Sequence, residues 1–500
     1  MKPGRERRLV TSAVMMGMFL AALEATAVAP ALPTAVGEMG GVARLSWVFS
    51  AYLLTSTTTV PLYGKLADLF GRRRIYHVAV ALFLLGSALS GMAGSIGQLI
   101  VFRAIQGLGA GGVNPVAITI VADIYTLEER GRMQGLFSGV WAFASLVGPF
   151  LGGVITELFS WRWIFYLNIP FGIASAVMLQ RYLSERKERR AHRLDVLGTI
   201  SLTAAVTLLL LVLTEGHDTW GWSDPRTLGL LAASAAILVA FFWQEGRAPE
   251  PMLPLELFKS RVIAVSSAGN VLIGALLYSI TAYVPMFAQA VLGGSPIDAG
   301  TILAPILVGW PIASTLSGRL MGRVTYRRLS IGGGLLLVAG GLLLARAGTA
   351  TTRWDVMLAM MVSGLGLGFL SMPFLLAVQS SVPWGQRGVA TSTVQFFRNI
   401  GGAVGVAILG SLFNARLAAA GATGAIGGAV GVNAVLDPAL RARLAPAELA
   451  RLSAAVLHGL QGVYRVLAAL AVLGLAVALL FPRGSAESLA LQTPDPEAAR

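Results

Sequence analysis

The sequence predicts an all-α membrane protein with fourteen transmembrane helices. Of its 500 residues, 55% are hydrophobic and only 12% are charged, whereas soluble domains carry roughly 25% charged residues. The apolar residues gather in repeated runs of about 20 residues, the length that an α-helix needs to cross a bilayer. Each run is therefore expected to form one transmembrane helix.

Fourteen such runs follow one another along the chain. The first has a basic start and an apolar body, like a signal peptide, but its length and the thirteen runs behind it favour an uncleaved span. The expected helices cover residues 12–33, 46–66, 75–94, 98–121, 133–156, 163–183, 195–214, 227–244, 261–290, 299–320, 331–347, 354–380, 391–413 and 459–481.

The two ends of the chain repeat each other at a nearly constant offset. Arg130-Gly131 recurs as Arg387-Gly388, and three glycines before the first pair recur at the same offset before the second. Duplicated helical halves around a mid-membrane site are the architecture of alternating-access carriers. The matching glycines are Gly107, Gly109 and Gly111 in the first copy and Gly364, Gly366 and Gly368 in the second.

This repeat divides the chain into two six-helix halves and two inserted helices. Arg103 corresponds to Met360 in the second copy, so we expect ion chemistry in the first half. The expected parts are an N-terminal half at 9–185, a cytoplasmic connector with the two inserted helices at 186–258, a C-terminal half at 259–481 with a long outer loop at 414–458, and a disordered tail at 482–500. An extra helix is expected at 445–457.

Charge and cysteine content exclude other classes of protein. The net charge of +14 could indicate a nucleic-acid partner, but most of the basic residues lie at alternate helix ends, as the positive-inside rule requires. Both termini are therefore expected in the cytoplasm, and no nucleic acid is expected. There are no cysteines, and the four histidines lack metal-ligand spacing, so we expect no metal site.

Glu24 is an acid in the middle of the first apolar run. An ionised carboxylate at such a depth costs at least ~2.5–3.5 kcal/mol, and intramembrane acids usually serve function. Arg103 and Gln106 lie in the fourth run, at depths of about 8 and 12 Å against about 14 Å for Glu24. Burial favours a neutral acid and a guanidinium favours the carboxylate, so we expect Glu24 to carry protons, with Arg103 and Gln106 beside it. The alternative is a static buried ion pair.

Four motifs resemble those of the major facilitator superfamily, in its fourteen-helix drug:proton antiporter branch. They are LEATAVAPALP from Leu23, GKLADLFGRRR from Gly64, RAIQGLGAG from Arg103, and the glycine-rich run that starts at Gly139. The resemblance covers roughly residues 9–481. One departure is Glu24, because the first motif usually carries an aspartate, which is shorter by one methylene.

The resemblance implies two further sets of functional residues. The loop motif implies a conformational latch between the second, third and fourth helices. The glycine-rich fifth helix implies tight packing that favours export over uptake, although small residues in membrane helices also pack for structural reasons alone. The latch residues are Gly64, Asp68, Gly71, Arg72 and Asp123, and the packing residues are Gly139, Gly148, Pro149, Gly152 and Gly153.

A few polar residues interrupt the apolar spans of the C-terminal half. They could contact substrate or bridge helices, and Arg398 could line a cavity or extend to the cytoplasm. The candidates for a substrate cavity are Asn270, Tyr278, Gln289, Gln379, Gln395 and Arg398.

The expected function is a proton-coupled antiporter that exports lipophilic drugs, with cationic drugs among the candidates, across the bacterial inner membrane. Loose apolar recognition suits a cavity rich in adaptable methionine. We expect a monomer in membrane lipid, driven by the proton gradient without a cofactor, and not an enzyme, since no nucleophile–base pair is evident. The alternatives are a dedicated exporter of one amphipathic metabolite or lipid, a proton-coupled uptake symporter, and a receptor that transports nothing.

Overall fold

The computed structural model is helical throughout its described part, which comprises residues 5–125, 127–183, 195–215, 221, 223–248, 251, 253, 255–321, 323–382, 387–420 and 428–482. Within these residues, fourteen α-helices are at least 20 residues long. Eleven described helices are long and apolar enough to cross a membrane by length and composition, and two shorter apolar stretches occur at Val147–Leu158 and Leu197–Leu213. The all-helical class is therefore confirmed, and the count of fourteen spans stays a prediction.

The chain divides into two compact units, which we describe one at a time. Unit 1 consists of Met1–Met252, Ser295–Gly300 and Ala429–Leu444, and unit 2 consists of Leu253–Gly294, Thr301–Gly428 and Ala445–Arg500. Most long helices each belong to a single unit. The exception is α10 (Pro296–Leu320), which begins in unit 1 and continues in unit 2.

The other helices of unit 1 are α1 (Arg5–Glu38), η1 (Val42–Arg44), α2 (Leu45–Phe70), α3 (Arg72–Gly91), α4 (Ile96–Ile124), α5 (Leu127–Leu158), α6 (Arg162–Tyr182), α7 (Val196–Glu215), α8 (Pro225–Glu245), α14 (Gly428–Leu436) and α15 (Pro438–Arg441). The other helices of unit 2 are η3 (Leu255–Lys259), α9 (Arg261–Ala290), α11 (Tyr326–Ala345), α12 (Arg353–Ser380), α13 (Arg387–Ala419) and α16 (Pro446–Leu480).

Polar side chains at the helix starts explain several of these boundaries. Ser95 accepts a hydrogen bond from the backbone of Gln98 at the start of α4, and Thr325 does the same for Arg328 at the start of α11. Thr352 and Asp355 form a complete capping box at the start of α12. Such caps satisfy backbone N–H groups that the first helical turn leaves without partners.

The last helix differs most from the expectation. α13 runs on through Ala419 and α16 begins at Pro446, so the segment between them is shorter than the outer loop expected at 414–458. The helix expected at 445–457 and the span expected at 459–481 form one continuous helix. The glycines at 459 and 462 do not end it, because a single glycine costs only about 1 kcal/mol inside a helix.

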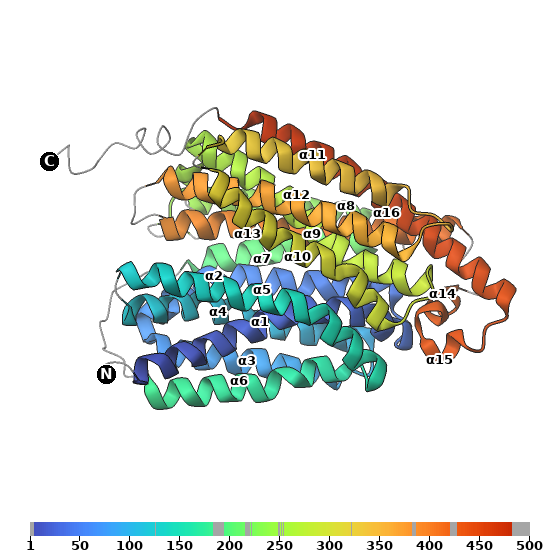
Figure 1. The fold of residues 1–500 in the computed structure, drawn as a ribbon, viewed down its shortest axis with the longest axis horizontal. Coiled ribbons are helices and arrows are strands. Elements are labelled where there is room, and N and C mark those ends of the chain that lie inside the picture. The colour runs from blue at the N-terminus through green and yellow to red at the C-terminus, as the bar shows by residue number, and fades with distance from the viewer. Residues whose placement is uncertain are drawn as a thin grey trace. The chain divides into compact units, whose positions relative to one another are not determined.

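The helix contacts of unit 1 recur in unit 2. In unit 1, α1 contacts α4, α5 and α6, and α3 contacts α4 and α6. In unit 2, α9 contacts α12, α13 and α16, and α11 contacts α12 and α16. Figure 1 shows α11 running beside the red α16 within unit 2. The repeated pattern matches helices 1, 3, 4, 5 and 6 with helices 9, 11, 12, 13 and 16.

The repeated glycines perform the same packing task in both units. A Cβ on Gly109 of α4 would overlap the backbone of Phe83 on α3, and a Cβ on Gly366 of α12 would meet the backbone of Leu337 on α11. The glycines before and after each of these two pack against a different helix. In α4, for example, a Cβ on Gly107 would meet the carbonyl oxygen of Tyr52 on α2. In membrane proteins such small residues let helix backbones approach closely. The constant offset in the sequence therefore reflects equivalent helix contacts.

The segment α14–α15 belongs to unit 1, although in the sequence it comes between α13 and α16, which belong to unit 2. The backbone N–H of Val42 donates to Oδ1 of Asn433 at 3.0 Å. Gly37, near the end of α1, leaves room for the backbone of Leu436 and Asp437. The segment therefore packs against the C-terminal end of α1.

Candidate functional site

Glu24 and Arg103 form a buried ion pair between α1 and α4. Glu24 is 1% exposed and Arg103 is 3% exposed, so water has almost no access to either side chain. Arg103 Nη1 donates to Glu24 Oε1 and also to Gln106 Oε1, the latter at 2.7 Å. The structure therefore brings together the three residues for which a proton-coupling role was predicted, and that role stays a prediction.

The second oxygen of Glu24 accepts a hydrogen bond from α6. Asn168 Nδ2 donates to Glu24 Oε2 at 2.6 Å and lies 2.8 Å from Ser87 Oγ on α3. Gln106 Nε2 donates to the same Ser87 oxygen at 3.2 Å. The Ser87 hydroxyl in turn donates to the carbonyl of Phe165 at 2.8 Å. Four helices of unit 1 thus supply a continuous polar network around one carboxylate.

Sequence reasoning missed Asn168 and Ser87. Asn168 is 2% exposed and Ser87 is fully buried. The available signal for Asn168 was an isolated amide in an apolar span, the same signal that selected Asn270 in the C-terminal half. Ser87 carried no signal of its own, because serine is common in membrane helices, where its hydroxyl often bonds within its own helix.

An aromatic ring covers the guanidinium of Arg103. Its Cζ lies 4.1 Å from the centre of the Tyr52 ring on α2, close enough for a cation–π interaction. Arg103 Nε is buried without a hydrogen-bond partner in the described part of the chain. The site therefore holds one carboxylate and one guanidinium, and it is closed to solvent in this structure. An ion pair held this way carries no net charge, and protonating Glu24 would leave Arg103 without its counter-charge.

The predicted latch is only partly described. Arg72 Nη1, at the start of α3, donates to the carbonyl of Thr119 near the end of α4 at 2.8 Å. Gly71 has a φ of 94°, a backbone conformation that residues with a side chain rarely adopt. No described atom lies within 4 Å of a Cβ built on Gly64. The side chains of Asp68 and Asp123 lie outside the described part of the structure.

The predicted packing glycines of α5 separate into two groups. Cβ atoms on Gly148 and Gly152 would overlap Thr26 and Ala27 of α1. One on Gly153 would lie 2.6 Å from the carbonyl oxygen of Pro296, the first residue of α10. The carbonyl of Pro149 takes the space that a side chain on Gly300 would need. Gly139 is different, because no described atom lies within 4 Å of its Cβ position.

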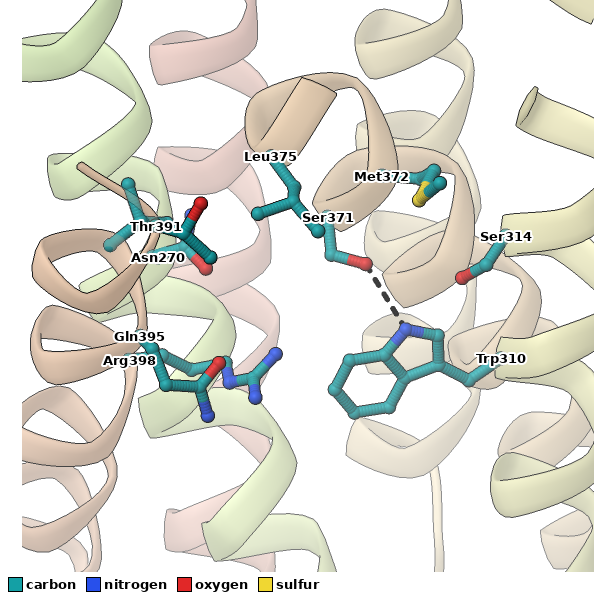
Figure 2. Close-up of a pocket in the computed structure, with 10 residues that line it drawn as sticks. Asn270, Trp310, Ser314, Ser371, Met372, Leu375, Thr391, Gln395 and Arg398 are labelled. Atoms are coloured by element: carbon teal, nitrogen blue, oxygen red, sulfur yellow. Dashed lines mark hydrogen bonds between the residues drawn. The ribbon is translucent and has the colours of Figure 1, made fainter. Parts of the chain in front are cut away.

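Unit 2 contains a cavity of about 180 Å³ between α9, α10, α12 and α13. Three of the predicted substrate residues line it: Asn270, Gln395 and Arg398. Figure 2 shows the guanidinium of Arg398 reaching toward the ring of Trp310, whose Nε1 donates to Ser371 Oγ at 3.1 Å. The Cζ of Arg398 lies 5.5 Å from the centre of that ring. The remaining lining residues are Ser314, Met372, Leu375, Thr391 and Val394.

The other predicted substrate residues do not line this cavity. Tyr278 donates to Asn399 Oδ1 at 3.3 Å and packs against α13. Gln379 donates to Thr391 Oγ1 at 3.1 Å, and Gln289 is buried in α9. Sequence reasoning also missed Trp310, although a tryptophan in the middle of a span, away from the membrane interface where tryptophan is common, was a usable signal.

Comparison with known proteins identifies the family. The model of the Major Facilitator Superfamily matches residues 14–406. The chain is 37% identical to the Multidrug transporter protein MdtP of Bacillus subtilis (strain 168), an alignment that covers 83% of this chain and 77% of that protein. It is 34% identical to Multidrug resistance protein 3 of the same organism, over 81% of this chain and 79% of that protein.

A solved structure shares the fold. The bacterial homologue of the human lysosomal transporter Spinster, in an inward-facing and unoccupied conformation, aligns with a TM-score of 0.65 at 16% identity. That alignment covers 99% of this chain and 100% of the other. The chain is therefore a multi-pass membrane protein that belongs to the major facilitator superfamily, a family of transporters rather than enzymes.

Proposed function

We propose that the chain is a proton-coupled antiporter that exports lipophilic drugs across the bacterial inner membrane. The observation that carries the proposal is the buried Glu24–Arg103 pair. The similarity to a multidrug transporter and to a multidrug resistance protein supports it. Transporters of this architecture expose a site between two halves to one side of the membrane at a time.

Glu24 suits the proton-carrying role because Arg103, in the same unit, balances the charge of its carboxylate. Breaking a buried ion pair by neutralising one partner costs about 3–5 kcal/mol, since the other charge remains buried and unpaired. Protonation of Glu24 would impose such a cost on Arg103. A rearrangement that gives Arg103 another partner, or admits water, would relieve it. Proton uptake by Glu24 is thereby linked to a change of conformation.

Two further sets of contacts support the direction and control of transport. The close packing of Gly148 and Gly152 against α1 places the fifth helix on the helix that carries Glu24, and we assign to it a role in favouring export. Arg72 ties the start of α3 to α4, and we assign a latch to it together with Gly64, Asp68, Gly71 and Asp123.

The proposal includes the topology expected from the sequence. It assigns fourteen spans in two six-helix halves, at 9–185 and 259–481, joined by a connector and two inserted helices. The fourteen described helices of at least 20 residues support that number. Both termini lie in the cytoplasm, and the protein works as a monomer in lipid without a cofactor.

Everted membrane vesicles test the proposal. Wild-type vesicles supplied with a pH gradient should accumulate members of a panel of lipophilic dyes and antibiotics, and addition of a substrate should release part of the gradient. Glu24→Gln should abolish both effects. Glu38→Gln is the matched control, because Glu38 lies on the same helix but is half exposed, 38% for its side chain, and pairs with Arg162.

Undiminished gradient-driven accumulation in the Glu24→Gln vesicles would refute the proton-carrying role. Accumulation of a single compound from the panel would identify a dedicated exporter. Gradient-driven movement in the opposite direction would identify an uptake symporter.

A further inference from the structure

Arg398 brings a positive charge to the cavity of unit 2, and the described side chains of that unit supply no counter-charge for it. It lies eleven residues into α13, roughly 16 Å along the helix from its start. Its Nε is buried without a hydrogen-bond partner, and no acidic side chain pairs with it among the described residues. Arg103 of unit 1, in contrast, has Glu24. These two arginines therefore differ in whether an acidic side chain of the same unit balances their charge.

The stretch of sequence that carries the cavity-lining residues offers no acid that could fill this role. Between Glu256 and Asp437, the only acidic residues are Asp298 and Asp355. Asp298 pairs with Ser295 at the start of α10, and Asp355 pairs with Thr352 at the start of α12. At 1.5 Å per residue they lie about 18 Å from Trp310 and about 24 Å from Ser371 along their helices. Both are too distant to neutralise Arg398.

An unpaired charge in a membrane protein is expensive, and such residues face a cavity and mark the path of a substrate or ion. Here Arg398 lines a cavity. The missing negative charge is therefore expected to arrive with a ligand.

We infer that this cavity binds the anionic end of the exported molecule, a carboxylate or similar monoanion attached to an aromatic or otherwise apolar body. The inference rests on the proposed export function and names its substrate class. A guanidinium binds a carboxylate through two parallel N–H donors. A cationic group in the same place would be repelled.

The rest of the lining fits such a ligand. Gln395 and Thr391 supply further polar groups beside Arg398, while Trp310, Met372 and Leu375 supply apolar surface. An apolar cavity of roughly 150 Å³ holds one benzene molecule. The volume of about 180 Å³ therefore admits an acid group and the ring next to it.

Equilibrium binding to the purified full-length protein in detergent tests the inference without any gradient. The probes are radiolabelled 1-naphthylacetate, its neutral amide 1-naphthylacetamide, and the lipophilic cation tetraphenylphosphonium. The wild type should bind the acid at least tenfold more tightly than the amide, and the cation should not compete with the acid.

Variants of Arg398 assign the preference to this residue. Arg398→Gln should remove the preference for the acid and leave the affinity for the amide unchanged, whereas Arg398→Lys should keep part of it. Arg328→Gln is the matched control, because it removes an exposed arginine from the start of α11 in the same unit. It should retain the full preference.

Equal affinity of the wild type for acid and amide would overturn the inference, as would a preference that survives in Arg398→Gln. The wild-type comparison decides even if the variant does not fold. Failure of the two proposals is separable: efflux of dyes without acid binding would leave the antiporter and remove the anion site. Acid binding without efflux would leave the anion site and remove the antiporter.

Discussion

Asn168 Nδ2 lies 2.6 Å from Glu24 Oε2, and this buried contact joins α6 to α1. Arg103 binds the other carboxylate oxygen. Glu24 is therefore held from two sides, by a charged donor on α4 and by a neutral donor on α6. The neutral donor can be removed without changing the charge of the site.

Replacing Asn168 by alanine should destabilise the protein and slow transport. The change leaves one oxygen of Glu24 buried without its donor, which costs about 1–3 kcal/mol. Asn168→Asp should be worse at neutral pH, because it sets two acids side by side. Its stability should recover as the pH falls, since protonation of one acid removes the repulsion. Thermal unfolding in detergent between pH 5 and 8 measures both effects, and a pH-independent Asn168→Asp variant would contradict the expectation.

Removing Arg103 alone should destabilise the protein more than removing the whole Glu24–Arg103 pair. Arg103→Met leaves Glu24 as an unpaired buried charge, at a cost of about 3–5 kcal/mol. The double variant Glu24→Leu/Arg103→Met replaces the pair by apolar side chains, and unit 2 already carries the buried Met360 at the position that matches Arg103. Replacement of a buried pair by packed apolar residues is often neutral or stabilising.

The double variant should therefore unfold at a higher temperature than Arg103→Met and still fail to couple transport to protons. Thermal unfolding and proton release in vesicles report the two properties separately. Coupled transport by the double variant would show that the proton travels elsewhere.

Gly152→Ala should destabilise the packing of α5 on α1. Its Cβ would overlap the carbonyl oxygen of Ala27, a backbone atom that a side-chain rotation cannot move away. Gly139→Ala is the control on the same helix, since no described atom lies within 4 Å of its Cβ. That substitution should be neutral or stabilising by up to about 1 kcal/mol, because alanine favours helix over glycine. Equal unfolding temperatures of the two variants would contradict the packing role.

Gly71→Ala should cost about 1–3 kcal/mol, because a residue with a side chain is strained at this backbone conformation. The φ of 94° and ψ of 140° turn the chain sharply between α2 and α3. Gly64→Ala, in the same motif but inside α2 with open space at its Cβ, should be neutral or stabilising by up to about 1 kcal/mol. A loss of transport in Gly64→Ala at unchanged stability would indicate that Gly64 is needed in another conformation.

The sequence was most informative where a charged residue interrupted an apolar span. An acid and an arginine in apolar spans predicted the contact between Glu24 and Arg103, because helix rise alone set both at similar depths. Evenly spaced glycines predicted two duplicated halves, and they pack in equivalent ways in α4 and α12. For most helices the starts and ends fell within a few residues of the limits of the apolar runs. Both ends of α1 and one end each of α5, α11 and α13 lie five to seven residues beyond the expected limit. The start of α16 lies farther away, because no strong breaker separates a surface turn from the span.

The remaining features depended on packing between helices. Asn168 reaches Glu24, and Ser87 reaches Asn168, only because α3 and α6 flank α1 and α4. A single sequence does not specify the rotation of each helix. The same holds for Arg398, which the sequence could assign equally to a cavity or to the cytoplasmic surface. Trp310 and Ser371 meet through the contact of α10 with α12, far apart in the chain.

The unequal charge of the two arginine sites has an electrical consequence. Glu24 and Arg103 together carry no net charge, whereas the charge of Arg398 is balanced only when an anion occupies its cavity. If one monoanion leaves for each proton that enters, every cycle carries the equivalent of two positive charges inward. A voltage of 100 mV, negative inside, then contributes about 2.3 kcal/mol for each of these charges. Export by such a cycle would continue on voltage alone, after the pH difference across the membrane has vanished.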